Sequence, residues 1–219
     1  MAKKHNHESV DTNIESLSKA EAFITKNNKK IVGGIVLVVA LVIGFIVFDS
    51  MSEQKKIESQ EQYTLVEDAA LNAIDSLTNA AALADLEQYI NEFGSKAVAS
   101  ASFEAGIAAF EVKDYEKAIK YFSEYESEDA TFNARALACI GDCYVELANY
   151  EEAYKYYALA VAEADNDLAS EYAFRAGLVA EKLGKMDKAV AMYNMIKDKY
   201  PTSPRAFEIE KYISRAEAK

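Results

Sequence analysis

Histidine is almost missing from this sequence of 219 residues, and the two that are present, His5 and His7, lie near its amino terminus. The rest of the chain has no imidazole for a catalytic triad, a general base or a zinc site. It also contains neither a glycine-rich phosphate loop nor a nucleophile elbow. We interpret the histidine pair as incidental, and we expect no enzyme, metal, cofactor or small-molecule substrate.

Positive charge is scarce beyond the first 30 residues. Residues 1–30 hold six lysines against four acidic residues, so within the formal total of −12 the rest of the chain carries −14. Such a surface repels phosphates and anionic headgroups, which argues against nucleic acid as a partner and against peripheral lipid binding. The acidity has two readings: it keeps the protein soluble, or it attracts basic partners.

One long apolar run interrupts this polar sequence. Residues 31–48 carry no charged or amide side chain, and as a helix they would measure roughly 27 Å, nearly the thickness of a bilayer core. A cleaved signal does not fit, because a long polar segment precedes the run and no small-residue cleavage site follows it. A lipoprotein signal is excluded, because it would need a cysteine at the end of the run and the first cysteine is Cys139. We predict a membrane anchor, with a buried core helix as the alternative.

Lysines on either side of the run predict its orientation. Those that precede it closely are Lys19, Lys26, Lys29 and Lys30. Only Lys55 and Lys56 follow it closely, among acidic residues. Cytoplasmic flanks retain positive charge during insertion, so the amino terminus is predicted to face the cytoplasm and residues 49–219 to lie on the other side.

Glycine and proline are absent between Gly44 and Gly94, so no residue forces a bend after the run. We expect the helix to continue through residues 51–77, with a break near Asp49 and Ser50 as the alternative. On the amino-terminal side, the capping-box spacing of Thr12 and Glu15 suits a short amphipathic helix, and the composition suits a disordered tail equally.

Three segments repeat the same pattern without a gap, at residues 102–122, 137–157 and 173–193. The residues that fall in register are Gly106, Gly141 and Gly177, then Ala118, Ala153 and Ala189, then Phe122, Tyr157 and Tyr193. A glycine inside a helix costs up to about 1 kcal/mol relative to alanine, so its recurrence at one phase indicates close helix approach. The aromatic residue is predicted to fill the space between units. Each unit is a helical hairpin that buries its apolar face only by stacking on its neighbours.

This pattern resembles the tetratricopeptide repeat, with a small residue in the first helix, an alanine and an aromatic residue in the second, and a period near 34 residues. The chain departs from it in lacking a large residue near the start of the first helix in two units. A degenerate copy lies upstream, where Ala70, Ala82 and Leu86 take the three phases, and residues 203–219 read as a capping helix. The predicted fold is all-α: one transmembrane helix followed by an α-solenoid of tetratricopeptide-like hairpins. Its parts are a cytoplasmic tail (1–30), a transmembrane helix (31–48), a helical connector (49–62) and the repeat domain with its cap (63–219).

Cys139 and Cys143 are four residues apart on one helix face. An oxidising compartment permits a disulfide in principle, but parallel side chains on a helix fit the required dihedral angle badly. We predict two small, buried packing residues.

Stacked hairpins form a concave face lined by the first helix of each unit. The resemblance implies that this groove is lined at three positions around each repeat glycine. Those residues are Phe103, Ile107 and Phe110, then Ala138, Asp142 and Val145, then Phe174, Leu178 and Glu181, with Arg135 close to the middle unit. The alternative is that neighbouring helices cover these apolar side chains. The lysine and asparagine positions with which some repeat proteins clamp a peptide carboxylate are not filled.

The layout also resembles the YfgM family, ancillary subunits of the Sec translocon in the inner membrane of Gram-negative bacteria. The resemblance implies a single-pass inner-membrane protein with a periplasmic repeat domain. Its implied partners are translocon subunits, a membrane-anchored chaperone and exported client proteins. The alternative function is a structural adaptor for cell-envelope assembly or division. Such adaptors usually carry a cleaved signal, a lipid anchor or a trimeric coiled coil, none of which is evident in this sequence.

Overall fold

The computed structural model describes residues 5–73, 75–164 and 166–218. The side chains of residues 5–16 lie outside this description, and with them the histidine pair and the predicted capping box. Every regular element in the described residues is a helix, which confirms the predicted all-α fold. The elements are α1 (His5–Leu71), α2 (Ser76–Phe93), η1 (Gly94–Lys96), α3 (Ala99–Glu111), α4 (Tyr115–Glu124), α5 (Ala130–Glu146), α6 (Tyr150–Glu163), α7 (Leu168–Lys182), α8 (Met186–Lys199), η2 (Ala206–Glu208) and α9 (Ile209–Glu217).

The chain divides into two compact units, Met1–Gln54 and Lys55–Lys219. In the described residues, the first unit consists of the amino-terminal part of α1, whose apolar stretch has no buried side chain. By length and composition, this helix is a candidate membrane span. It continues without a break through Asp49 and Ser50. None of the apolar stretch is buried, unlike the usual core helix of a soluble protein.

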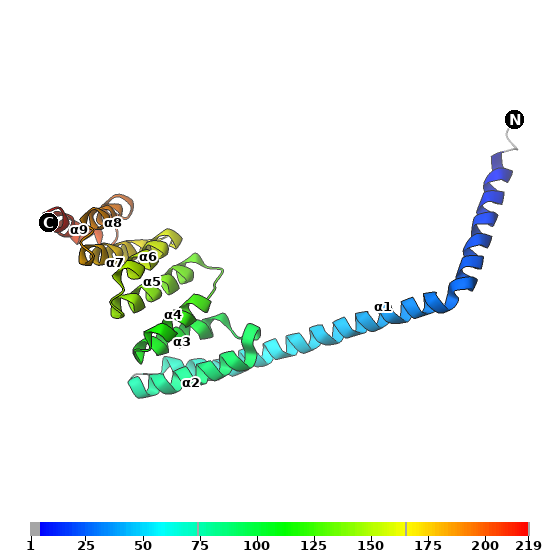
Figure 1. The fold of residues 1–219 in the computed structure, drawn as a ribbon, viewed down its shortest axis with the longest axis horizontal. Helices are drawn as coiled ribbons and strands as arrows, with labels where there is room; N and C mark the ends of the chain where they lie inside the picture. The colour runs from blue at the N-terminus through cyan, green and yellow to red at the C-terminus, as the bar shows by residue number, and fades with distance from the viewer. Residues whose placement is uncertain (1–4, 74, 165, 219) are drawn as a thin grey trace. The chain divides into compact units, whose positions relative to one another are not determined.

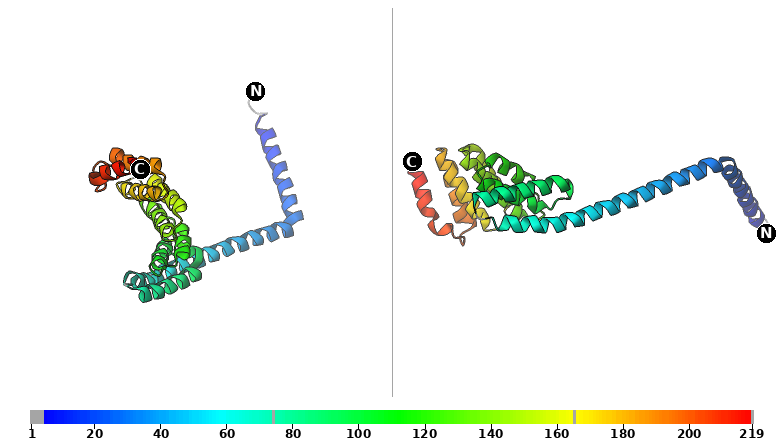
Figure 2. Two further views of the ribbon diagram at one scale, coloured as in Figure 1. Left: turned by 60° about the vertical axis from the view of Figure 1, so that its left-hand side comes forward. Right: turned by 90° about the horizontal axis from the view of Figure 1, so that it is seen from below.

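The second unit is a stack of helical hairpins. The hairpins are α3 with α4, α5 with α6, and α7 with α8, and each helix packs against the next along the chain. Figure 1 shows this succession, and both views in Figure 2 agree with it. The capping segment η2 and α9 closes the stack by burying Ile209 and Ile213. At the other end, Ala82 and Leu86 of the degenerate copy are buried in α2.

The repeat glycines make room for the repeat aromatics. A β-carbon added to Gly106 would lie 2.6 Å from the Phe122 ring, and one added to Gly141 would lie 2.7 Å from the Tyr157 ring. At Gly177 the ring of Tyr193 is closer still. The sequence predicted close approach at these glycines correctly. It placed the aromatic between units, whereas the ring packs first on the glycine of its own hairpin.

The turns inside the three hairpins share one backbone geometry. Lys113, Ala148 and Gly184 occupy corresponding positions, with φ angles of 65°, 56° and 71°. In each turn the following N–H donates to a carbonyl five residues earlier, which satisfies an acceptor at the helix end. Glycine adopts this left-handed conformation without strain, whereas Lys113 and Ala148 are strained in it. The sequence did not predict the conformation at these two residues.

Charged side chains link the second hairpin to the third, and the third hairpin to the capping segment. Four ion pairs join residues that are 33 or 34 positions apart, one repeat period. The pairs are Arg175 with Asp142, Lys185 with Glu151, Arg205 with Glu171, and Arg215 with Glu181. Burial alone would raise the pKa of Glu171, but hydrogen bonds from Arg205 and Arg175 outweigh it and lower that pKa. The pairs therefore fix the register between units as well as their contact.

The last turns of α1 belong to the second unit and are tied to it by polar contacts. The buried hydroxyl of Ser59 lies 2.6 Å from that of Tyr89 and donates to the carbonyl of Lys96. The hydroxyl of Tyr63 donates to Oε1 of Glu104 at 2.7 Å. The other carboxylate oxygen of Glu104 is buried without a hydrogen-bond partner among the described residues. Burial disfavours the charged form of this carboxyl group and therefore raises its pKa.

Replacing Glu104 with glutamine is expected to stabilise the second unit by about 1 kcal/mol at neutral pH, because a half-buried charge is removed while the acceptor for Tyr63 stays. A carboxyl group whose pKa is raised on folding destabilises the folded state at high pH. The loss develops as the pH rises from the ordinary pKa of the group, about 4.3, through its raised pKa in the folded protein. The gain should therefore vanish near pH 4. Urea denaturation of the full chain in detergent at pH 7 and pH 4 measures it, with the exposed Glu92→Gln as the control. An equal gain at both pH values would contradict the assignment.

Candidate functional site

An apolar pocket of about 240 Å³ opens between α3 and α5. It brings together five of the residues predicted for the groove, which are Phe103, Ile107, Phe110, Arg135 and Asp142. Phe122, Glu111 and Cys139 complete the lining. The pocket is smaller than the roughly 300–1,000 Å³ typical of small-molecule sites. Its size and apolar walls suit a single large side chain.

Aromatic contacts hold the walls of this pocket in place. The ring centroid of Phe103 lies 5.4 Å from that of Phe122 and 5.2 Å from that of Tyr125. Phe110 packs against Tyr115 at 5.4 Å. Ile107 is 38% exposed, so it is the apolar wall residue most open to solvent. The site is therefore preformed, with one aliphatic side chain free to contact a ligand.

The polar residues at the pocket differ in how they are engaged. The guanidinium of Arg135 lies 5.4 Å from the ring centroid of Phe103, and no carboxylate of the described residues pairs with it. Asp142 instead accepts a hydrogen bond from Tyr157 at 2.6 Å and pairs with Arg175 at 2.7 Å. Burial raises the pKa of Cys139 to about 11, so its thiol stays protonated at neutral pH. The pocket thus offers apolar contact and one cation.

The third unit places its predicted groove residues differently. Phe174 is buried, with Arg205 4.0 Å from its ring centroid and Tyr212 of α9 packed edge-on at 4.7 Å. Glu181 accepts a hydrogen bond from Tyr193 and pairs with Arg215. Leu178 of the third unit is 38% exposed, whereas Val145 of the second unit is partly buried against the core. The capping segment therefore covers this part of the face.

Two of the pocket residues missed by the groove prediction had signals of other kinds in the sequence. Phe122 stands at the repeat aromatic phase, which indicated core packing. Its ring is buried in the core and also lines the pocket. Cys139 was predicted to be a buried packing residue and is mostly buried at the pocket wall. Glu111 had no signal, because its position ends α3 and falls outside the groove spacing.

A family model described as a tetratricopeptide repeat-like domain matches residues 21–207. The chain belongs to this family. Among solved structures, a crystal structure of the MamA protein is similar with a TM-score of 0.54 and 17% identity, over 73% of this chain and 88% of that one. A second MamA structure gives 0.48 and 18%, over 64% and 88%. A search of curated proteins found no match.

Membership of the tetratricopeptide repeat-like family assigns this chain to the protein-binding repeat proteins. Such folds are typically non-catalytic scaffolds that present surfaces to other proteins. The likeness to MamA concerns the fold alone. Within the described residues, no group of three or more histidine, cysteine or acidic side chains could hold a metal ion.

Proposed function

We propose that this chain is a membrane-anchored repeat protein that binds apolar side chains of newly exported polypeptides in the pocket between α3 and α5. The observation that carries the proposal is the open apolar lining formed by Phe103, Ile107 and Phe110. An unfolded polypeptide offers single apolar side chains, which this pocket accepts one at a time. Because the walls are already packed, little conformational entropy is lost when a side chain enters.

The anchor and its sidedness belong to the same proposal. The exposed apolar stretch of α1 suits a lipid environment, and lysines concentrated before it favour a cytoplasmic amino terminus. The repeat domain then lies in the periplasm of a Gram-negative cell, at the inner membrane. In line with the resemblance of the layout to ancillary translocon subunits, we assign the Sec translocon and a membrane-anchored chaperone as the resident partners.

Crosslinking in intact cells tests this function. A photoreactive residue replaces Ile107 at the pocket in one variant and Val38 in the apolar stretch in another, since both side chains are exposed. Varied exported chains captured at Ile107, with translocon subunits captured at Val38, would support the proposal. Capture of one folded envelope protein at Ile107, without translocon contact, would replace it with the structural adaptor.

Ile107→Glu is expected to weaken binding of unfolded apolar polypeptides at least tenfold, because a desolvated charge opposes entry of an apolar side chain. The exposed position of Ile107 should leave the melting temperature unchanged. Isothermal titration calorimetry with a reduced, unfolded client measures the affinity. Leu159→Glu on α6, where the leucine is 44% exposed, is the matched control. Equal loss in both variants would move the binding site elsewhere.

A further inference from the structure

Three large apolar side chains are exposed at the loops that join one hairpin to the next. Phe132 near the start of α5 is 49% exposed, and Leu168 at the start of α7 is 45% exposed. Phe207 in η2 is 85% exposed. These residues, here called the apolar row, lie outside the pocket between α3 and α5. A phenylalanine so fully exposed to water gains nothing for the fold of its own chain.

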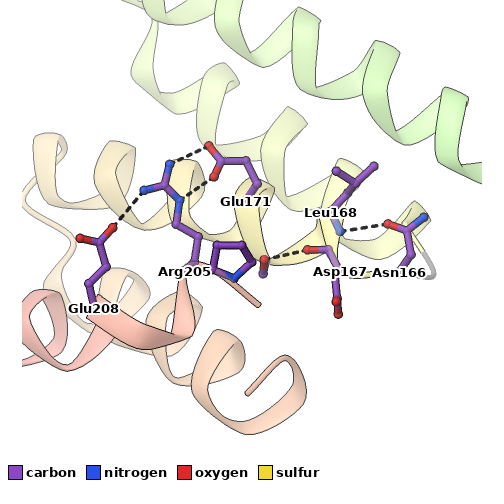
Figure 3. Close-up of a pocket in the computed structure, with 8 residues that line it drawn as sticks. Asn166, Asp167, Leu168, Glu171, Arg205 and Glu208 are labelled. Carbon is purple, nitrogen blue, oxygen red and sulfur yellow. Dashed lines mark hydrogen bonds and ion pairs between the residues drawn. The ribbon is translucent and has the colours of Figure 1, made fainter. Parts of the chain in front are cut away.

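Side-chain contacts place the apolar row along one edge of the stack. Asn166, two residues before Leu168, donates to the hydroxyl of Thr131, next to Phe132, at 3.0 Å. A surface cavity of about 900 Å³ then joins Leu168 to the segment that carries Phe207. Figure 3 shows Asn166, Asp167 and Leu168 on one side of it and Arg205 and Glu208 on the other. Of the apolar row, Leu168 lines this hollow, and Phe207 lies in the chain between two of its lining residues, Arg205 and Glu208.

The segments around Phe132 and Leu168 are acidic. Neither residues 121–134 nor residues 156–174 contain a lysine or arginine. The cavity contains one basic residue, Arg205, and it pairs with both Glu171 and Glu208. In the described loops and at the adjoining helix end, the carboxylates without a basic partner of their own are those of Glu126, Glu128, Asp129, Glu163 and Asp167.

We propose that this edge binds a cationic, amphipathic segment of a partner protein. The apolar row would take the apolar face of the segment, and the acidic loops would pair with its lysine and arginine side chains. Charge complementarity of this kind speeds association and excludes acidic partners, while the buried apolar area supplies affinity. Nucleic acid has the wrong charge for this edge. The site is separate from the pocket for exported chains, so both can be occupied at once.

Binding of a designed peptide to the full chain in zwitterionic nanodiscs tests the edge. The probe is a fluorescent helical peptide of about 18 residues, with leucine on one face and lysine on the other. The variant carries Phe132→Ser, Leu168→Ser and Phe207→Ser, and we expect its dissociation constant to rise roughly tenfold. The matched control carries Leu65→Ser, Leu71→Ser and Leu77→Ser, which remove exposed leucines of α1 and α2 that lie outside the connecting loops of the apolar row. Equal weakening in both variants, or no binding by the unaltered chain beyond that of empty nanodiscs, would overturn the proposal.

Charge gives a second arm of the same experiment. Glu128→Gln combined with Asp167→Asn should weaken binding and flatten its dependence on salt, whereas Glu116→Gln on α4 should change neither. A peptide with glutamate in place of lysine should not bind. Equal binding of that acidic peptide would overturn the role of charge. Ile107→Glu should leave the affinity unchanged, so failure of the pocket function and failure of this edge give different results.

Discussion

Gly177→Leu is expected to lower the stability of the second unit by about 4 kcal/mol and its melting temperature by roughly 10 °C. The new side chain occupies the space of the Tyr193 ring, which is fully buried and whose hydroxyl is held by Glu181. A rigid ring cannot move aside by a few tenths of an ångström without leaving the core. The gain in helix propensity, about 1 kcal/mol, is too small to offset this loss.

A compensating change separates steric conflict from other causes. Tyr193→Ala alone should also be destabilising, but combined with Gly177→Leu it restores space, so the double variant should be more stable than the two losses predict by at least 1 kcal/mol. Lys182→Leu, at an exposed position of the same helix, is the control. Thermal melting of the full chain in detergent, followed by near-ultraviolet circular dichroism of tyrosine, measures each variant. Strict additivity would show that the glycine and the ring do not compete for space.

Arg175→Met is expected to cost about 2 kcal/mol, because it leaves the Asp142 carboxylate without a cation and leaves Glu171 with only Arg205. Its guanidinium bonds both oxygens of Asp142, at 2.8 and 2.7 Å, and donates to Glu171 at 3.1 Å. The groups are about one-third exposed, so the loss should fall below the 3–5 kcal/mol of a fully buried pair. Urea denaturation gives the free energy, and the loss should shrink in acid, where the carboxylates become neutral.

Two further variants test whether the pairing itself is responsible. Lys155→Met removes an exposed ion pair with Glu152 and should change stability by less than about 1 kcal/mol. Asp142→Asn in the background of Arg175→Met removes the unpaired charge and keeps an acceptor for Tyr157, so it should recover part of the loss. A loss in Lys155→Met as large as that in Arg175→Met would mean that burial of the pair is irrelevant.

The fold could be predicted from the sequence because the same packing pattern occurs in three successive segments. Glycine, alanine and aromatic residues recur at one phase, and one copy alone would not have distinguished a core position from chance. The apolar stretch was recognisable as a candidate membrane span from its length and lack of charge. The positive φ angles at Lys113 and Ala148 were not predicted, because in a sequence it is glycine that indicates this conformation.

The residues predicted for the groove are open in the first unit and covered in the third, and this difference has a physical reason. Spacing around each repeat glycine identifies which residues face the concave side, and it identified Phe103 and Ile107 at the pocket. It does not report what covers that side, which depends on neighbours from outside the unit. Tyr212 and Arg205 cover Phe174, and both come from the segment after the last repeat. The apolar row was not predicted, because the sequence pattern around the repeat glycines does not indicate exposed side chains in the connecting loops.

The ion pairs that reach back one repeat period bear on how such an array could lengthen during evolution. Two of these pairs join the second hairpin to the third, and two join the third hairpin to the capping segment. The third hairpin carries Leu178 at the position where the second carries Asp142, so a copied third hairpin would place its arginine opposite a leucine. Lengthening the array by exact duplication would therefore leave charges unpaired, and each new junction would need ion pairs of its own.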